Sequence, residues 1–397
     1  MRVLLLSSWF PHPPDNGARI RVLNIVRQLA RDGHHITLLS FCRRPASEDA
    51  LAAVRRLCSD VRTTPYIAFR PGRVRALVGL LSTRPRSLID TYSDQMADLV
   101  RGACAAEHYD VAIASTIEMA PYALLAEGTP RILEEVELAT LREQAAQGNL
   151  AQRARYGLTW RKTAHYVRRM VERFDACTVV SAQERALLAE VAPGYDRAAI
   201  VPNGVDLDAY AGDFGVPEPN TLIHTGALSY RANYDAVDYL LREIYPLVHQ
   251  CRPAATLRIT GSTDGLDLSG LPASPGAVYT GYLPDIRPAI ARSWVSVVPL
   301  RVGGGTRLKI LEAMALGTPV VATSKGAEGL DVCHGENILI GDTPMRFAGA
   351  VVDVLKDPRL RARLAAGGRS LVTERYGWQR IGPGLCALVR DIAGRAP

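Results

Sequence analysis

The chain has 397 residues, which is long enough for two domains that each bury a core of their own. Hydrophobic residues make up 48% of the sequence and charged residues 22%, a balance typical of a soluble globular protein that excludes a disordered chain. No apolar run approaches the roughly 20 residues that a membrane-spanning helix needs, which excludes an integral membrane protein.

The excess of basic residues gives a net charge of +7. This charge favours anionic partners such as phosphate-bearing molecules, anionic lipid or nucleic acid, although an Arg-rich surface alone would produce it as well. The seven cysteines are scattered without a CxxC pair, as expected for reduced thiols in a cytoplasmic protein. The eight histidines show no HxH or HExxH spacing, so we expect no bound metal and no cofactor.

Short apolar strands alternate with amphipathic helices along almost the whole chain, which predicts parallel sheets covered by helices. Several strands are nearly continuous apolar runs, as expected when both faces of a sheet are buried. The predicted strands lie at residues 2–6, 35–41, 109–114, 131–133, 176–180, 198–201, 221–225, 254–260, 277–280, 295–300, 319–322 and 337–340. The clearest helical patterns lie at residues 19–31, 234–250, 307–316 and 378–395.

A turn and a Gly/Pro-rich connector at residues 203–220 interrupt this alternation before it restarts. We therefore predict an α/β protein of two Rossmann-like, doubly wound parallel-sheet domains at residues 1–205 and 206–375. A final helix at residues 376–397 is expected to pack back towards the first domain. Ligands of such sheets bind at the carboxyl ends of the strands, so we expect the site in strand-to-helix loops around a central cleft.

The most informative segment is a buried strand that is followed by three glycines, at residues 303–305, and then by a helix. Glycine permits close approach of a ligand to the backbone, and the free amides and dipole of a helix N-terminus favour a phosphate. Arg307 and Lys309 add positive charge at this end. Glu312 lies seven residues after Gly305, about 10 Å along the helix axis, where its carboxylate could accept ribose hydroxyls. The alternative is an ordinary Gly-rich strand-to-helix loop, with Glu312 either capping or solvated.

This segment resembles the donor-binding motif of retaining glycosyltransferases of family 4, which have the GT-B fold. The motif reads GGGTRLKILEAMA at residues 303–315. Four further stretches fit the same family: PPDNGAR at 13–19 with the helix end LARDGH at 29–34, VVS at 179–181, VPNGVD at 201–206 and GAEGL at 326–330.

The resemblance implies that the second domain binds a nucleotide sugar while the first lies on the acceptor side. It assigns the ribose to Glu312 and the leaving phosphate to Arg231. The other implied donor-side residues are Gly226, Asn233, Gly304, Gly305, Thr306, Arg307 and Lys309. Cations and amides at these positions would stabilise the negative charge that builds on the departing phosphate. The family often has two glutamates eight positions apart, but position 304 is glycine here, which leaves the residue that contacts the sugar unassigned.

In the first domain, the resemblance places the backbone of Gly17 near the donor phosphates, although a tight turn with a helix cap explains the same residues. Glu118 follows a predicted strand where family members often carry a histidine, and it is our candidate for orienting the acceptor. Glu134, Glu135 and Glu137 follow the next strand. They could bind acceptor hydroxyls, but a solvated loop is the simpler interpretation.

The implied function is transfer of a sugar with retention to a saccharide or lipid-linked acceptor, in the synthesis of cell-surface polysaccharide or glycoconjugates. The alternatives are a GT-B nucleotide-sugar epimerase and an inactive nucleotide-sugar-binding module that regulates a partner. Arg-rich amphipathic segments at residues 70–81 and 153–173 suit an anionic bilayer, unless they are simply surface helices. We therefore expect a cytoplasmic protein that contacts the inner face of the membrane. No nucleic-acid-binding motif accompanies these segments, so we expect no nucleic acid partner.

Overall fold

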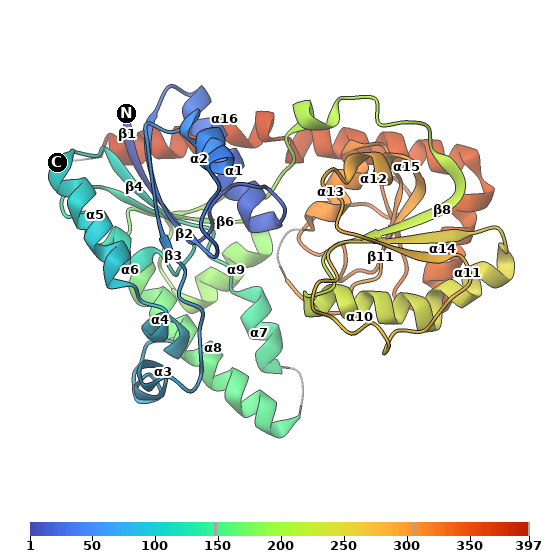
Figure 1. The fold of residues 1–397 in the computed structure, drawn as a ribbon, viewed down its shortest axis with the longest axis horizontal. Coiled ribbons are helices and arrows are strands. Elements are labelled where there is room, and N and C mark those ends of the chain that lie inside the picture. The colour runs from blue at the N-terminus through green and yellow to red at the C-terminus, as the bar shows by residue number, and fades with distance from the viewer. Residues whose placement is uncertain (147–148, 305–306, 396–397) are drawn as a thin grey trace. The chain divides into compact units, whose positions relative to one another are not determined.

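The computed structural model describes residues 1–146, 149–304 and 307–395 (Figure 1). Its internal contacts divide the chain into two compact units. Unit 1 comprises Met1–Pro202 and Ile381–Pro397, and unit 2 comprises Asn203–Arg380. Each unit is a parallel sheet covered by helices, which confirms the predicted fold class of two doubly wound α/β domains.

The sheet of unit 1 contains seven parallel strands among the described residues, in the order β3-β2-β1-β4-β5-β6-β7. The two central strands, β1 and β4, pair in register from Val3 opposite Val111 to Ser7 opposite Ser115. Apart from Arg2 at its start, every residue of these two strands is buried, as their apolar sequences predict. The strands are β1 (Arg2–Ser7), β2 (His35–Cys42), β3 (Asp60–Pro65), β4 (Val111–Ser115), β5 (Arg131–Glu134), β6 (Ala176–Val179) and β7 (Ala198–Ile200).

The edge strand β3 was missed by the sequence prediction. Its residues, DVRTTP, mix charged and polar side chains with few apolar ones, and only Val61 and Thr64 are buried. An edge strand pairs on one side only, so it lacks the continuous apolar pattern of the central strands. Pro65, which has no amide proton to donate, is tolerated at this edge.

The helices of unit 1 are α1 (Gly17–Arg31), α2 (Glu48–Arg55), α3 (Val74–Val78), α4 (Arg86–Asp90), α5 (Asp94–Ala106), α6 (Ala120–Ala123), α7 (Ala139–Ala146), α8 (Leu150–Val171) and α9 (Ala182–Val191). The last helix of the chain, α16 (Trp378–Ala393), has its C-terminal part in the same unit. That part contacts α1: the Cys386 thiol donates to the Gln28 carbonyl, and Arg390 pairs with Asp32.

The sheet of unit 2 contains six parallel strands among the described residues, in the order β10-β9-β8-β11-β12-β13. Neighbouring residues of the central strand β8 face different cores, because Leu222 belongs to one apolar cluster and Ile223 to the other. The strands are β8 (Glu218–Thr225), β9 (Thr256–Thr260), β10 (Ala277–Gly281), β11 (Ser293–Val298), β12 (Val320–Ala322) and β13 (Leu339–Ile340).

The helix predicted at residues 234–250 is interrupted. It consists of α10 (Arg231–Tyr239), a π-helical turn η2 (Leu240–Ile244) and α11 (Tyr245–Cys251). Pro246 lies at the start of α11 and lacks the amide that would continue the α-helical ladder, which accounts for the π turn. The other helices of unit 2 are η1 (Leu207–Tyr210), α12 (Arg287–Ala291), α13 (Leu308–Ala315), α14 (Pro344–Lys356), α15 (Pro358–Leu371) and η3 (Val372–Tyr376).

A buried ion pair lies at the centre of unit 1. The Arg21 guanidinium on α1 donates from Nε to Oε1 of Glu134 on β5 at 2.8 Å, and from Nη2 to the Val201 carbonyl at 3.0 Å. Ser115 on β4 donates to the second carboxylate oxygen of Glu134 at 3.2 Å. Burial alone would lower the pKa of Arg21, but Glu134 and Glu135 hold it above its ordinary value. The solvated loop expected at Glu134 was therefore wrong, because this carboxylate is fully buried.

Replacing Arg21 with methionine should lower the free energy of unfolding by about 3–5 kcal/mol, because it leaves the buried Glu134 charge unpaired. Urea denaturation followed by circular dichroism measures this loss. Arg62→Gln is the matched control, since the Arg62–Asp60 pair has side chains that are 41% and 40% exposed. It should change the stability by less than about 1 kcal/mol. Equal losses in the two variants would contradict a central role for the buried pair.

Candidate functional site

The strand order of each sheet reverses at one point, which defines where a crevice can form. In unit 2, β8 leads to β9 on one side while β11 leads to β12 on the other. In unit 1 the same reversal lies between β1 and β4, where Ser8 and Thr116 in the loops that follow these strands share a hydrogen bond of 3.1 Å. Ligands of open α/β sheets bind at such switch points, so the loops after these four strands are the candidate sites.

Glycine is required in both loops at the switch point of unit 2. Gly226, directly after β8, has a φ of +133°, and a Cβ at this position would lie 2.5 Å from Nδ2 of Asn233. Gly303, after β11, has a φ of +98°, and a Cβ there would lie 3.1 Å from Cβ of Ala232 on α10. The backbones of the two loops therefore lie against side chains of α10 at glycines whose conformation other residues rarely adopt.

Asn233 joins three elements at this point. Its Nδ2 donates to the Ala227 carbonyl at 2.9 Å, and its Oδ1 accepts from Nζ of Lys309 on α13 at 2.8 Å. Burial and the neighbouring Arg307 charge lower the pKa of Lys309 to about 7, although Glu312 raises it. An anion bound here would compensate for the burial of the ammonium group and restore its charge.

The two predicted arginines of unit 2 are placed differently. Arg307 is only 6% exposed, and its guanidinium donates to the carbonyls of Gly304 at 2.7 Å and Gly303 at 2.5 Å. Arg307 therefore shapes the Gly-rich loop from within. Arg231 begins α10 with an exposed side chain, and among the described residues this side chain has no ion pair and no hydrogen bond. Arg231 can therefore reach a ligand without breaking a contact with the described residues.

Glu312 already accepts a hydrogen bond from within the protein. The hydroxyl of Tyr210, in the short helix η1, donates to Oε1 of Glu312 at 2.8 Å. Burial raises the pKa of Glu312, while the Tyr210 hydrogen bond and the charge of Lys309 lower it. The second carboxylate oxygen is free of this bond. Tyr210 lies 102 residues before Glu312 in the sequence, and no local pattern connects the two.

Two predicted donor-side residues, Gly305 and Thr306, lie outside the described residues. The neighbouring Gly304 is described, and its carbonyl accepts a hydrogen bond from Arg307. The structure therefore gathers Gly226, Asn233, Lys309 and Glu312, with Arg231 at the start of α10, around one edge of the unit 2 sheet.

In unit 1, Gly17 is the first residue of α1, directly after the cap residue Asn16, whose side chain accepts from the Arg19 amide at 3.1 Å. Glu118 follows β4 and is exposed, yet the surrounding protein raises its pKa, an effect that the charge of Arg43 opposes. Gly17 and Glu118 thus follow the two strands between which the order of the sheet reverses.

Three residues beside Glu118 escaped the sequence analysis. Arg43 lies against the rings of Trp9 and Tyr66, with its guanidinium carbon 4.2 Å and 4.4 Å from their centroids. These residues follow β2, β1 and β3 respectively. The common signal was their place directly after a strand, but Tyr66 could not be found in this way because β3 itself was missed.

Two family models match the chain. The model for glycosyl transferases group 1 matches residues 219–357, and the model for the glycosyl transferase 4-like domain matches residues 16–204. The first match contains the switch-point loops of unit 2, and the second contains Gly17 and Glu118.

Individual relatives match the chain over different lengths. Glycogen synthase of Mycobacterium tuberculosis is 24% identical over 96% of this chain and 92% of its own length. The GDP-mannose-dependent alpha-(1-6)-phosphatidylinositol monomannoside mannosyltransferase of Mycolicibacterium smegmatis is 26% identical over 56% of this chain and 64% of its own. Among solved structures, sucrose-phosphate synthase of Thermosynechococcus elongatus superposes with a TM-score of 0.71 at 18% identity, over 99% of both chains. Anabaena HepE in complex with UDP and glucose gives a TM-score of 0.68 at 16% identity, over 98% of this chain and 99% of its own.

The fold and the matches define the class: this is an enzyme that transfers a sugar from a nucleotide-linked donor. It is a glycosyltransferase with the GT-B fold. These findings favour sugar transfer over the epimerase and the inactive module. In the part of the chain that the structure describes, no helix has both the length and the apolar character to cross a membrane.

If Glu312 binds the ribose, as the sequence leads us to expect, replacing Tyr210 with phenylalanine should weaken binding of UDP or GDP roughly tenfold, the equivalent of one hydrogen bond to a charged group. The hydroxyl lowers the pKa of Glu312, so its loss raises that pKa and moves the acid limit of binding to higher pH. Calorimetric titration at several pH values measures both effects. Tyr279→Phe is the control, because the Tyr279 hydroxyl has no hydrogen-bond partner among the described residues. Unchanged affinity and an unchanged pH limit in Tyr210→Phe would contradict a contribution of the Tyr210–Glu312 hydrogen bond to nucleotide binding.

Proposed function

We propose that the chain is a retaining glycosyltransferase of family 4 that transfers a hexosyl group to a saccharide or lipid-linked acceptor in cell-surface polysaccharide or glycoconjugate synthesis. The observation that carries the proposal is that two cations and a carboxylate occur together at the unit 2 switch point. Lys309 and Arg231 suit a diphosphate, and Glu312, three residues along α13 from Lys309, suits the ribose hydroxyls. The match to a glycosyl transferase 4-like domain supports the family.

In this proposal the leaving diphosphate lies beside Lys309 and Arg231. Negative charge builds on the phosphate as the glycosyl bond breaks, and preplaced cations and amides stabilise that charge. Because the pKa of Lys309 is lowered to about 7, this side chain is neutral in most molecules above pH 7 when no anion is bound. Donor binding therefore takes up a proton at this lysine, and affinity falls as the pH rises.

We propose further that the reaction needs no metal, since Arg231 and Lys309 supply the positive charge that a divalent cation would otherwise bring. Retention follows if the departing phosphate accepts the acceptor proton on the face that it leaves. Glu118, with Trp9, Arg43 and Tyr66, would then orient the acceptor. Turnover that is unchanged in EDTA, with a product whose anomeric configuration by NMR matches that of the donor, is the expected result.

The donor assignment predicts a specific pattern of thermal stabilisation. One sugar nucleotide from a panel of UDP-, GDP-, ADP- and TDP-sugars should raise the melting temperature of the parent, because a ligand of the native state stabilises it by mass action. Glu312→Ala and Lys309→Met should lose this shift, and the parent should show a smaller shift at pH 8.5 than at pH 6.

The control for this pattern is Glu336→Ala, which alters an exposed carboxylate elsewhere in unit 2 and should keep the shift. Stabilisation of all three variants by the same donor would contradict the proposed site. Stabilisation of the parent without turnover on any acceptor would instead favour a binding module.

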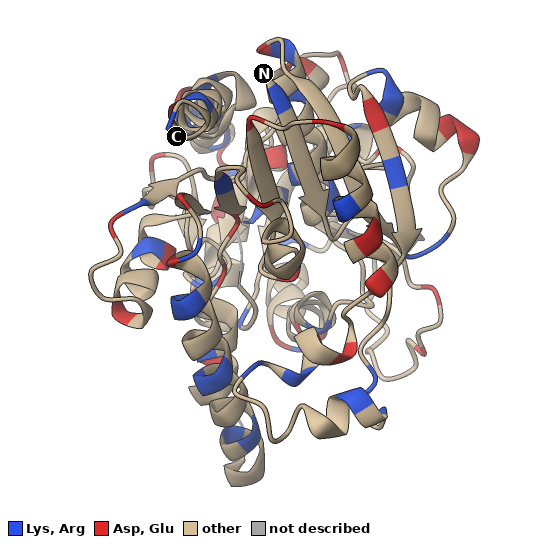
Figure 2. Cartoon of the chain, turned by 90° about the vertical axis from the view of Figure 1, so that its left-hand side faces the viewer, with Lys and Arg blue, Asp and Glu red and all other residues tan. Residues whose placement is uncertain are grey.

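We propose a peripheral contact of unit 1 with anionic membrane at the cytoplasmic face, which suits a lipid-linked acceptor. Val74, Val78 and Leu81, in and just after α3, are 76%, 61% and 94% exposed. Lys and Arg recur along α8, the long helix at the lower left of Figure 2. An exposed apolar segment beside a basic helix fits the boundary between the headgroups and acyl chains of a bilayer.

The double variant Val78→Ser/Leu81→Ser should reduce co-sedimentation with phosphatidylglycerol vesicles several-fold, because it removes apolar side chains that would enter the bilayer. Binding of the parent should fall as salt rises, since salt screens the attraction to anionic lipid. Val216→Ser is the control, because Val216 is a comparable exposed residue of unit 2 at 81%. Equal vesicle binding by the parent and the double variant would contradict the contact.

A further inference from the structure

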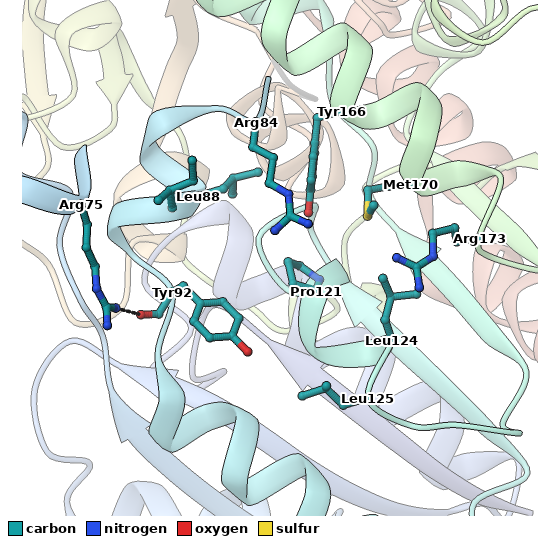
Figure 3. Close-up of a pocket in the computed structure, with 11 residues that line it drawn as sticks. Arg75, Arg84, Leu88, Tyr92, Pro121, Leu124, Leu125, Tyr166, Met170 and Arg173 are labelled. Atoms are coloured by element: carbon teal, nitrogen blue, oxygen red, sulfur yellow. Dashed lines mark hydrogen bonds between the residues drawn. The ribbon is translucent and has the colours of Figure 1, made fainter. Parts of the chain in front are cut away.

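A cavity of about 550 Å³ lies in unit 1 between α4, α6 and α8 (Figure 3). Its wall is largely apolar and includes Leu88 from α4, Leu124 and Leu125 from the end of α6, and Met170 from α8. These side chains leave part of their apolar surface accessible at the cavity. None of the residues assigned to the donor or to the acceptor lines it.

The cavity is positively charged. Arg84 and Arg173 extend into the same space from opposite sides, near Pro121 (Figure 3). Both side chains are exposed, and among the described residues neither forms an ion pair or a side-chain hydrogen bond. A smaller adjoining cavity of about 80 Å³ shares Arg84 and Arg173 and adds Arg169. No aspartate or glutamate appears among the described residues that line either cavity.

Exposed apolar residues lie beside this charged cavity. The ammonium group of Lys162 on α8 donates to the carbonyls of Gly79 at 3.2 Å and Leu80 at 2.8 Å, which fastens the chain after α3 to α8. Leu80 and Leu81, held in this way, are 47% and 94% exposed. Arg84 follows three residues after Leu81, so the charged rim and the apolar segment are continuous in the chain.

The occupant must satisfy both features. Inorganic phosphate would pair with the two guanidinium groups but leave the apolar wall in water, and a neutral lipid would cover the wall but leave the cations unpaired. An amphiphile with a phosphate at one end fits both. The exposed Leu80 and Leu81 indicate that it comes from a bilayer surface beside α3.

We propose that this cavity binds one anionic phospholipid of the membrane, with its phosphate between Arg84 and Arg173 and the start of its hydrocarbon against Leu88, Leu124, Leu125 and Met170. The lipid is an anchor and not a reactant. The inference rests on the proposed membrane contact, but it is independent of the donor chemistry in unit 2.

The test uses soluble short-chain lipids below their micelle-forming concentration, so that no bilayer is present. Dihexanoyl phosphatidylglycerol should bind the parent in a calorimetric titration, while dihexanoyl phosphatidylcholine and glycerol 3-phosphate should bind at least tenfold more weakly. Arg84→Gln/Arg173→Gln should lose at least tenfold in affinity for the anionic lipid. Leu88→Trp, which fills the cavity and keeps every charge, should lose as much.

The matched control is Arg55→Gln/Arg56→Gln, which removes two exposed arginines of unit 1 that do not line the cavity. It should change the affinity less than twofold. All variants should keep their melting temperature and the shift induced by the sugar-nucleotide donor, which separates this inference from the proposed function.

Three results would overturn the assignment. Equal losses in the two double variants would show attraction to surface charge alone. Equal binding of glycerol 3-phosphate would show a phosphate site in which the hydrocarbon plays no part. The third result is that a short-chain isoprenyl phosphate binds the parent and not Arg84→Gln/Arg173→Gln, while phosphatidylglycerol binds neither protein. This result would show that the cavity binds the acceptor instead of an anchoring lipid.

Discussion

A parallel sheet offers space for a ligand where neighbouring strands send their following helices to opposite faces, and this constraint organises both units. In unit 2 the reversal separates the loops after β8 and β11. At Gly226 and Gly303 the backbones of these loops lie close to side chains of α10. In unit 1 the reversal separates the loops after β1 and β4, where Glu118 lies. The chemistry of the enzyme is therefore confined to a few loop residues, while the strands behind them are fixed by apolar burial.

Buried charge is used in two opposite ways. Arg21 and Glu134 satisfy each other within unit 1, and their hydrogen bonds reach four neighbouring strands or strand ends. In unit 2, the ammonium group of Lys309 donates to the amide oxygen of Asn233, and burial together with the Arg307 charge lowers its pKa. The first arrangement stabilises the fold without a ligand. The second disfavours the charged form of the lysine unless an anion is bound, and a perturbed pKa of this kind is typical of a binding site.

The central strands were predictable because each is an almost continuous apolar run, and the Gly-rich loop because its composition and spacing are local. What escaped prediction depends on packing. The edge strand β3 carries too few apolar residues to stand out. Tyr210 meets Glu312 only after unit 2 has folded, and Arg43 meets Trp9 only through the order of the sheet. Glu134 was misjudged because its partner, Arg21, lies on a helix 113 residues earlier in the chain.

The assignment of the last part of α16 to unit 1 has a consequence for synthesis. The chain leaves unit 1 at Pro202 and returns to it at Ile381, and the backbone of Val205 bonds to both Tyr376 and Trp378 where these crossings meet. Every residue of unit 2 therefore leaves the ribosome before the part of α16 that completes unit 1. Unit 1 is therefore begun first and completed last, and in the interval the surface of α1 that α16 will contact stays uncovered in the nascent chain.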